Sequence, residues 1–409
     1  MVTSPIPTED DALGTGRWVI LGAVWLIYFC FGVTAASMAP LVAPISDDLN
    51  TGNAVMGLIL GAWPAAYIAA AIPCGAALDR FGARRMLFLA ALIMAASGIA
   101  RSTAETPVQM IVAVALFGLG GPLISIGAPK VIARLFEGPS RGMAMGIYVT
   151  GPYLGGIVAL AFTNSVAMPL ANGDWRGVML LYAALVAASG LIWLAIVYAP
   201  FTRWPDRNAE GGKKFDLRAF VDIVRVPDVR VILAMSIGIF FINHGLNNWL
   251  PEILKGHGFS AVEAGYWAAL PSVLGVVVAL IVPRLATPQR RLPIMAGLFA
   301  CSLFASLCLQ LASPYALIPG LLAQGMARGA MMTIAILILM ETPSVPPERL
   351  GLAGGLFFTA AEIGGVLGPV TFGVLSGLSG GFALPLMALS GVCLGLFWTV
   401  ARLRATQTY

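Results

Sequence analysis

The sequence predicts an all-α membrane protein of twelve transmembrane helices, arranged as two pseudo-symmetric six-helix halves. Composition is the first reason: 59% of the 409 residues are hydrophobic, 11% are charged and the mean hydropathy is +0.88, whereas a soluble domain is about 25% charged. Unbroken apolar runs are the second, because a bilayer-spanning helix needs about 20 such residues and a barrel strand about 10 alternating ones. An internal repeat is the third.

The apolar runs divide the chain into twelve expected spans with mostly short connections. These spans cover residues 18–43, 54–77, 85–104, 108–133, 142–168, 176–199, 230–254, 260–282, 293–312, 315–340, 351–377 and 381–402. One connection is long, polar and charged. We therefore expect an N-terminal half over residues 1–200, a linker over 201–229 and a C-terminal half over 230–409.

The repeat relates the fifth span to the eleventh. The segment GMAMGIYVTGPYLGG (142–156) aligns with GLAGGLFFTAAEIGG (351–365), and six residues recur 209 positions later. A parallel repeat of this kind is typical of transporters whose two halves rock about a site at their interface. The repeat also places Tyr153 opposite Glu362, so both are expected to face that site.

Basic residues predict the topology, because Lys and Arg accumulate in cytoplasmic loops. With the N-terminus inside, nineteen lie on the inner side, whereas Arg101, Arg176 and Lys255 lie on the outer side. We expect a multi-pass protein of the inner (plasma) membrane with both termini in the cytoplasm. The net charge of +5 is then a matter of topology and does not indicate nucleic-acid binding. The cysteines and the two histidines show no metal-ligand or catalytic spacing, so we expect neither a cofactor nor an enzyme.

A charged loop between the second and third spans carries a family signature. GAALDRFGARR (75–85) resembles the loop 2–3 signature of the major facilitator superfamily. LPEILKGHGFSAVEAG (250–265) and GDWRG (173–177) are similar to other connections of that superfamily. The resemblance covers nearly the whole chain and is strongest to the branch that transports cyanate and 2-nitroimidazole. It implies the major facilitator fold and secondary active transport by alternating access, with a small-molecule substrate and a monomeric chain in the lipid bilayer.

The resemblance also implies that this loop is a conformational latch. In one conformation, Asp79 would contact the N-terminal end of the eleventh span, where a carboxylate is favourable by about 0.3–1 kcal/mol. The alternative is that the charges only cap helices and fix topology. Glycines at both ends of the signature would allow close approach and a tight turn. The latch candidates are Gly75, Asp79, Arg80, Gly82, Arg84 and Arg85.

Two charged residues lie within spans. Placing a charged side chain in a span costs about 2.5–3.5 kcal/mol of free energy, so such a residue usually has a functional role. Arg328 lies in the tenth span and Glu362 in the eleventh. A buried ion pair would explain both, and it could be purely structural. Alternatively, protonation of Glu362 could free Arg328 to hold an anion, or Glu362 could itself hold a cation.

Polar and aromatic residues complete the candidate binding site. The seventh span carries FFINHGLNNWLP (240–251), in which Asn243 and Asn247 share one helix face and His244 could titrate near neutral pH. Aromatic side chains can form walls or a cage around a small solute, although they also anchor helices at the membrane interface. The aromatic candidates are Trp25, Tyr28, Trp63, Tyr67, Tyr148, Tyr153 and Trp267.

The expected function is transport of a small organic or inorganic anion held by Arg328, Asn243 and Asn247, with proton coupling through Glu362 or His244 left open. One alternative is a cationic or zwitterionic amine held by Glu362 and aromatic rings. A second is drug efflux, because GPYLGG (151–156) partly matches the signature of drug antiporters.

Overall fold

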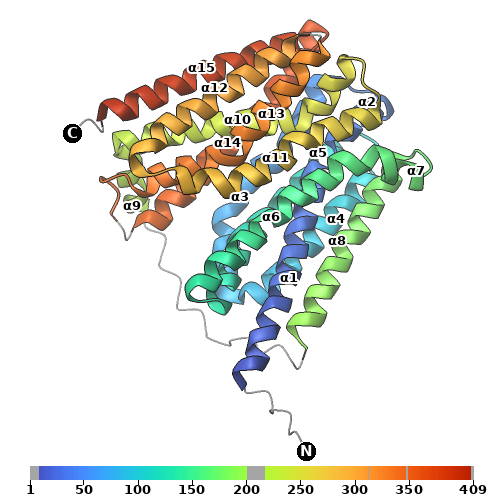
Figure 1. Cartoon of the computed structure of the whole chain (residues 1–409). Coiled ribbons are helices and arrows are strands. Elements are labelled where there is room, and N and C mark those ends of the chain that lie inside the picture. Colours follow the sequence, from blue (N-terminus) through green and yellow to red (C-terminus); the bar gives the residue numbers. More distant parts are fainter. Residues whose placement is uncertain (1–8, 200–216, 312, 347–348, 407–409) are drawn as a thin grey trace, which may run out of the picture.

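The computed structural model describes residues 9–199, 217–311, 313–346 and 349–406, and within them twelve helices are long and apolar enough to cross a membrane. Figure 1 shows them in two bundles, one coloured blue to green and the other yellow to red. This architecture confirms the two six-helix halves expected from the sequence. The expected span limits agree with the helices to within a few residues, with two exceptions. Helix α1 runs from Glu9 to Ala36 where residues 18–43 were expected, and α6 ends at Phe162 where residue 168 was expected.

The first half contains six spans and several short segments. Its elements are α1 (Glu9–Ala36), η1 (Ala39–Leu41), α2 (Val42–Asp48), α3 (Asn53–Phe81), α4 (Ala83–Ser102), α5 (Pro107–Leu135), α6 (Gly138–Phe162), the π-helical turn η2 (Thr163–Ala167), α7 (Met168–Leu170) and α8 (Trp175–Val197). The start of α5 is fixed by reciprocal hydrogen bonds between Thr106 and Gln109, which satisfy backbone donors that the helix leaves open.

The second half repeats this plan after the linker. Its elements are α9 (Leu217–Arg225), α10 (Pro227–Gly256), α11 (Ala261–Leu285), η3 (Pro288–Arg290), α12 (Arg291–Gln310), α13 (Pro314–Met340), α14 (Leu350–Ser379) and α15 (Ala383–Thr406). Helix α9 lies in the segment expected to be a polar connection, and its Ile223 is buried against α10 and α14. Residues 201–216 of the expected linker lie outside the described residues, and its last residues already belong to α10, which begins at Pro227.

Matching glycines place equivalent helices in close contact in both halves. A Cβ atom on Gly155 would overlap the carbonyl oxygen of Phe29 where α6 crosses α1, and one on Gly364 would overlap that of Ile237 where α14 crosses α10. Gly155 and Gly364 are repeat partners, 209 positions apart. The internal repeat therefore preserves a backbone-to-backbone crossing that a larger side chain would prevent.

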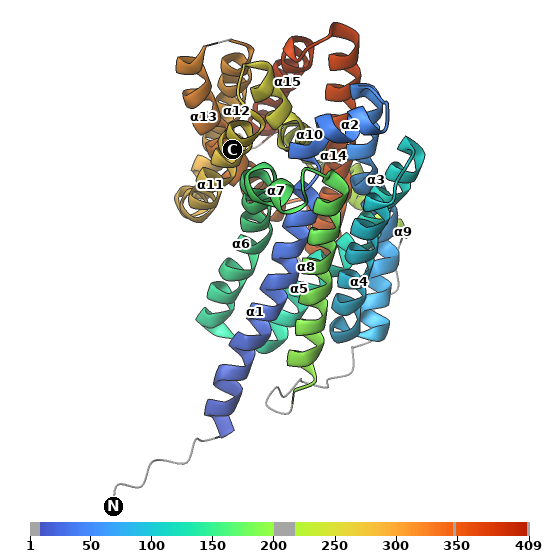
Figure 2. The ribbon, with the colours of Figure 1, turned by 90° about the vertical axis from the view of Figure 1, so that its right-hand side faces the viewer.

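The two halves touch on the side of the membrane away from the chain termini. There α3 packs against α14 at Gly57 and Gly373, and Asn164 donates to the carbonyl oxygen of Ala261 at the start of α11 (3.1 Å). On the side of the termini, a Cβ on Gly146 of α6 or on Gly355 of α14 would meet nothing within 4 Å. The bundles accordingly diverge toward that side (Figure 1), and Figure 2 shows the same two bundles after a turn of 90°.

Arg101 is more deeply placed than an outer-loop residue would be. It lies in the last turn of α4 and is 2% exposed. Its guanidinium donates to the carbonyl oxygen of Thr34 and to Ser37 Oγ, each at 3.3 Å, and lies over the ring of Phe117. Thr34 belongs to the last turn of α1, where helix carbonyls lack helical partners and the dipole favours a cation. Arg101 therefore caps α1.

Candidate functional site

The latch loop forms a tight turn at the side of the termini. Helix α3 ends at Phe81 and α4 begins at Ala83, so Gly82 alone makes the turn, with φ of 78°. That value lies in the region that favours glycine. Gly75 lies inside α3, and a Cβ there would meet nothing within 4 Å. Gly82 therefore has the expected turn geometry, whereas the close approach expected at Gly75 is not formed in this conformation.

Asp79 pairs with a residue of its own half. Lys130 Nζ of α5 donates to Asp79 Oδ1 at 2.5 Å, and both side chains are partly exposed. The contact with α14 that the resemblance implied is not formed in this conformation. At the beginning of α14, Arg349 instead pairs with Asp222 of α9 at 3.3 Å.

The three latch arginines differ in their surroundings. Arg80 lies over the ring of the adjacent Phe81, at 5.1 Å. Arg84 donates to the carbonyl oxygen of Val197 (3.2 Å), and its guanidinium lies over the ring of Tyr198. These two contacts connect α4 to the end of α8. Arg85 is exposed. Arg80 and Arg84 thus stabilise helix ends within the first half.

Arg328 and Glu362 do not form the expected ion pair. Arg328 Nη1 donates to Asn247 Oδ1 at 2.8 Å, whereas Glu362 is 6% exposed and its Oε2 atom has no hydrogen-bond partner. No ion pair within 4 Å joins them, although the structure describes both. Arg328 is directed to Asn247 of α10 and Glu362 lies beside Gly365, so the adjacency of α13 and α14 in sequence does not bring these two side chains together.

Glu362 and His244 share a space that Gly365 leaves free. A Cβ on Gly365 would lie 2.6 Å from Glu362 Oε2 and 3.2 Å from His244 Nδ1. The ring of His244 is stacked between those of Trp63 and Phe240, with centroid distances of 5.3 and 5.4 Å. Since Trp63 belongs to α3 and His244 to α10, this stack joins the two halves at the level of the candidate site.

Tyrosines from three helices form the opposing side of the site. Tyr28 of α1 stacks on Tyr148 of α6, with centroids 5.2 Å apart and planes 8° from parallel. Tyr67 of α3 shares a hydrogen bond with Ser125 (2.7 Å) and lies close enough to Glu362 to feel its charge. Tyr153 lies at a similar range from Arg328 of the other half.

These contacts bring most of the predicted binding residues together. The group that meets between the halves comprises Trp63, Tyr67, Tyr148, Tyr153, His244, Asn247, Arg328 and Glu362. Most of them are half-buried, so they retain surface that a solute between the halves can reach. We define this group, together with Tyr28, as the central site.

Two other predicted residues have a looser relation to the central site. Trp25 donates from Nε1 to Thr150 Oγ1 (3.0 Å) and stacks on Phe29, so its polar atom is already used within the first half. Asn243 is half-buried one turn before Asn247 on α10, and no hydrogen bond joins its side chain to another described residue. Their place in binding stays a prediction.

Sequence reasoning missed two polar side chains near the central site. Gln324 is 4% exposed, lies one helical turn before Arg328 on α13, and its Oε1 atom has no hydrogen-bond partner. Ser125 holds the hydroxyl of Tyr67. The sequence did contain a signal for Gln324, because a lone amide precedes an arginine by four residues inside an apolar span. Residues four apart lie on the same helix face.

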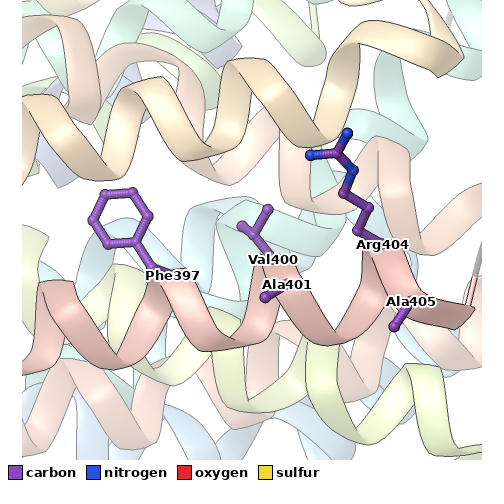
Figure 3. A pocket seen from close by; sticks show the side chains of 5 residues that line it. All are labelled: Phe397, Val400, Ala401, Arg404 and Ala405. Atoms are coloured by element: carbon purple, nitrogen blue, oxygen red, sulfur yellow. The ribbon is translucent and has the colours of Figure 1, made fainter.

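A separate hollow of about 450 Å³ lies beside the end of α15. Figure 3 shows Phe397, Val400 and Arg404 projecting from one face of that helix, with Ala401 and Ala405 completing the wall. No residue of the central site lines this hollow, and it is therefore distinct from the interface between the halves.

Comparison with known proteins agrees with this architecture. The probable galactarate/D-glucarate transporter GudP of Escherichia coli (strain K12) is 23% identical over 403 residues, covering 88% of each chain. The 2-nitroimidazole transporter of the same organism is 25% identical over 404 residues, covering 93% of this chain and 96% of the relative. The crystal structure of the nucleoside transporter NupG superimposes with a TM-score of 0.76 at 13% identity, covering 97% of this chain and 100% of NupG.

These relatives are transporters and not enzymes, and one of them comes from the branch that the sequence resembled most. The model of the Major Facilitator Superfamily matches residues 24–369, most of the chain. The expected fold and the expected class of membrane transporter are confirmed. This chain belongs to the Major Facilitator Superfamily.

Proposed function

We propose that the chain is a secondary active transporter that moves a small organic anion across the inner membrane by alternating access. The observation that carries this proposal is the environment of Arg328, which contains no counter-charge from the described residues. Its guanidinium lies half-buried in a membrane span, and among the described residues only the neutral amide of Asn247 receives a hydrogen bond from it. A cation at this depth is costly without a counter-charge. A bound carboxylate supplies that charge and can form two parallel hydrogen bonds with the guanidinium.

The relatives support an organic anion. Galactarate and D-glucarate, the solutes after which the GudP transporter is named, are both organic anions. At 23% identity the likeness supports the class of solute, and the guanidinium of Arg328 is the group that would recognise that class here.

Glu362 is the proposed proton-binding group. Its carboxyl group is buried, has an oxygen without a hydrogen-bond partner and has no cation within ion-pair distance among the described residues. Burial disfavours the charged form of a carboxylate by several kcal/mol. Uptake of a proton would remove this cost and leave Arg328 as the uncompensated charge of the central site, which couples proton binding to anion binding.

The alternating-access proposal follows from where the halves touch. We place both termini in the cytoplasm on the distribution of Lys and Arg. The described conformation then faces inward, because the halves meet on the outer side and diverge on the inner side. In the opposite conformation Asp79 would exchange Lys130 for the beginning of α14, so that the latch forms as the outer side opens.

The alternative of an amine substrate is less well supported. An amine would need the Glu362 carboxylate as its counter-ion, yet that side chain is 6% exposed, whereas the Arg328 guanidinium is the charged group that remains reachable. The repulsion between Arg328 and an approaching ammonium group also disfavours a cation. For drug efflux, the geometry offers no specific support.

A thermal-shift experiment on the purified protein tests the anion proposal. A ligand at 100 times its dissociation constant adds about 2.7 kcal/mol to stability, so millimolar carboxylates and amines can be compared directly. We expect stabilisation by carboxylates such as benzoate, and its loss in Arg328→Gln. The matched control is Arg290→Gln, which removes the same charge from an exposed residue of η3.

The outcomes separate the two candidate substrate classes. Stabilisation by choline or another amine that is lost in Glu362→Gln but not in Arg328→Gln would contradict the proposal. Carboxylates that stabilise Arg328→Gln as well as wild type would also contradict it. The expected result is that carboxylates no longer stabilise Arg328→Gln but still stabilise Arg290→Gln.

A further inference from the structure

The two halves supply different chemistry to the central site. Its charged and amide groups come from α10, α13 and α14 of the second half, and its tyrosines and tryptophan come from α1, α3 and α6 of the first half. The stack of Trp63 on His244 brings the two sets face to face, and Tyr153 lies close enough to Arg328 to feel its charge. A solute between the halves therefore meets a charged, hydrogen-bonding wall on one side and an aromatic wall on the other.

The aromatic wall is suited to a flat ring. Tyr28 and Tyr148 stack on each other nearly in parallel, Tyr148 is 7% exposed, and the half-buried Tyr28 is the member of the pair that keeps surface for a ligand. Tyr67 meets the edge of Trp63 at an interplanar angle of 83°. Ring faces and ring edges are thus both offered, and these are the two arrangements in which aromatic groups attract one another. An acyclic carboxylate can use neither arrangement.

The charge of the polar wall suits one carboxylate. Within the described part of the chain, Arg328 is the basic residue that lies among these groups. Arg101 is engaged at the end of α1, and Lys130 is paired with Asp79. The second carboxylate of a dianion would lie beside the Glu362 carboxyl group or against the tyrosine rings. In either place a charge would be desolvated without a partner.

We propose that the substrate is a monocarboxylate whose carboxylate group is attached to a flat ring. The carboxylate accepts hydrogen bonds from Arg328 and from the amide nitrogen of Asn247, and the ring lies against Tyr28 and Tyr148. This inference rests on the proposed anion transport and narrows it, because it excludes inorganic anions, acyclic acids and diacids as preferred substrates.

Four acids that vary ring and charge independently test the inference. Benzoate has a ring and one charge, terephthalate a ring and two charges, acetate one charge and no ring, and succinate two charges and no ring. Titration calorimetry of the detergent-purified full-length chain gives each dissociation constant. We expect benzoate to bind at least tenfold more tightly than each of the other three.

A pair of variants tests the aromatic wall directly. Tyr148→Leu should weaken benzoate binding at least fivefold and leave acetate binding within twofold of wild type. Tyr182→Leu is the control, because Tyr182 lies in α8 of the same half and shares a hydrogen bond with Thr163, away from the central site. Melting temperatures without ligand establish that both variants are folded.

The outcomes distinguish this inference from the proposed function. If all four acids bind with equal affinity and Arg328→Gln binds none of them, the ring preference is overturned while the proposal of anion binding stands. If benzamide, an uncharged ring, binds as tightly as benzoate, the charge has no role and both proposals fail. Equal effects of Tyr148→Leu and Tyr182→Leu on benzoate would likewise overturn the aromatic wall.

Discussion

Gly373→Ala should shift the transporter away from the conformation described here. On the side of the membrane opposite the termini, Gly373 of α14 lies against the backbone of α3. A Cβ atom added there would overlap the carbonyl oxygen of Asn53 and lie 2.9 Å from Gly57 Cα and 3.0 Å from Gly57 N. All of these neighbours are backbone atoms, so no side-chain rotation can make room.

The expected magnitude follows from the displacement that α3 and α14 would need. Carbon atoms in favourable contact are about 3.5–4.0 Å apart, so the two helices must separate by roughly 1 Å at this point. Overpacking of this kind costs about 1–3 kcal/mol. The cost falls only on the conformation in which these helix ends touch, and it corresponds to a change of about 5- to 150-fold in the equilibrium between conformations.

Cysteine labelling measures that equilibrium. In a background without the five native cysteines, Val370→Cys would place one thiol where α14 faces Gly61 of α3. A membrane-impermeant maleimide added from outside should react with it about 5- to 150-fold faster in Gly373→Ala, in line with the expected population shift.

Gly377→Ala is the matched control for this prediction. It lies one helical turn further along α14 on the same face, and its added Cβ would be 3.7 Å from Ala54 N, an ordinary contact. Both substitutions give the same gain in helix propensity, about 1 kcal/mol. The control should label at the wild-type rate. Equal labelling rates in Gly373→Ala, Gly377→Ala and wild type would refute the reasoning.

Three further predictions concern other parts of the molecule. Gly365→Ala should push Glu362 away from its position and lower proton-driven uptake in vesicles by about tenfold, equivalent to ~1.4 kcal/mol, with a near-normal melting temperature; uptake at the wild-type rate would contradict this. Arg101→Ala should lose about 1.5–3 kcal/mol of stability because α1 loses its charged cap, and an unchanged thermal unfolding midpoint would argue against the capping role. Asp79→Asn should alter stability by less than about 1 kcal/mol, since its pair with Lys130 is partly exposed, yet it should slow uptake with little change in substrate binding; unchanged turnover would count against the latch.

Much of the fold was predictable because the bilayer imposes a simple physical requirement. A span needs about 20 apolar residues, and the apolar runs of this chain located all twelve spans. The repeat of residues 142–156 in 351–365 predicted the two halves, and Gly155 and Gly364 show why it persists, since both sit at backbone crossings. Helix α9 was not predicted, because its nine residues are too few and too polar to resemble a span.

The sequence singled out charged and polar residues inside the spans, but it did not show how they pair. Arg328 and Glu362 stood out because charge inside a span is expensive, but their partners depend on how α13 and α14 are rotated. In the structure Arg328 donates a hydrogen bond to Asn247, and Glu362 lies beside Gly365 and His244. The burial of Arg101 was hidden for the same reason, because it depends on the end of α1, a helix distant in sequence.

The sequence by itself determined the class of protein, the spans, the repeat and the presence of a charged loop at residues 75–85, since each of these depends on local composition or on identity between segments. Tertiary structure decided which charges meet, which side of the molecule is closed and which half supplies the rings and which the ions of the central site. These features arise from contacts between helices far apart in the chain, so no local pattern can encode them.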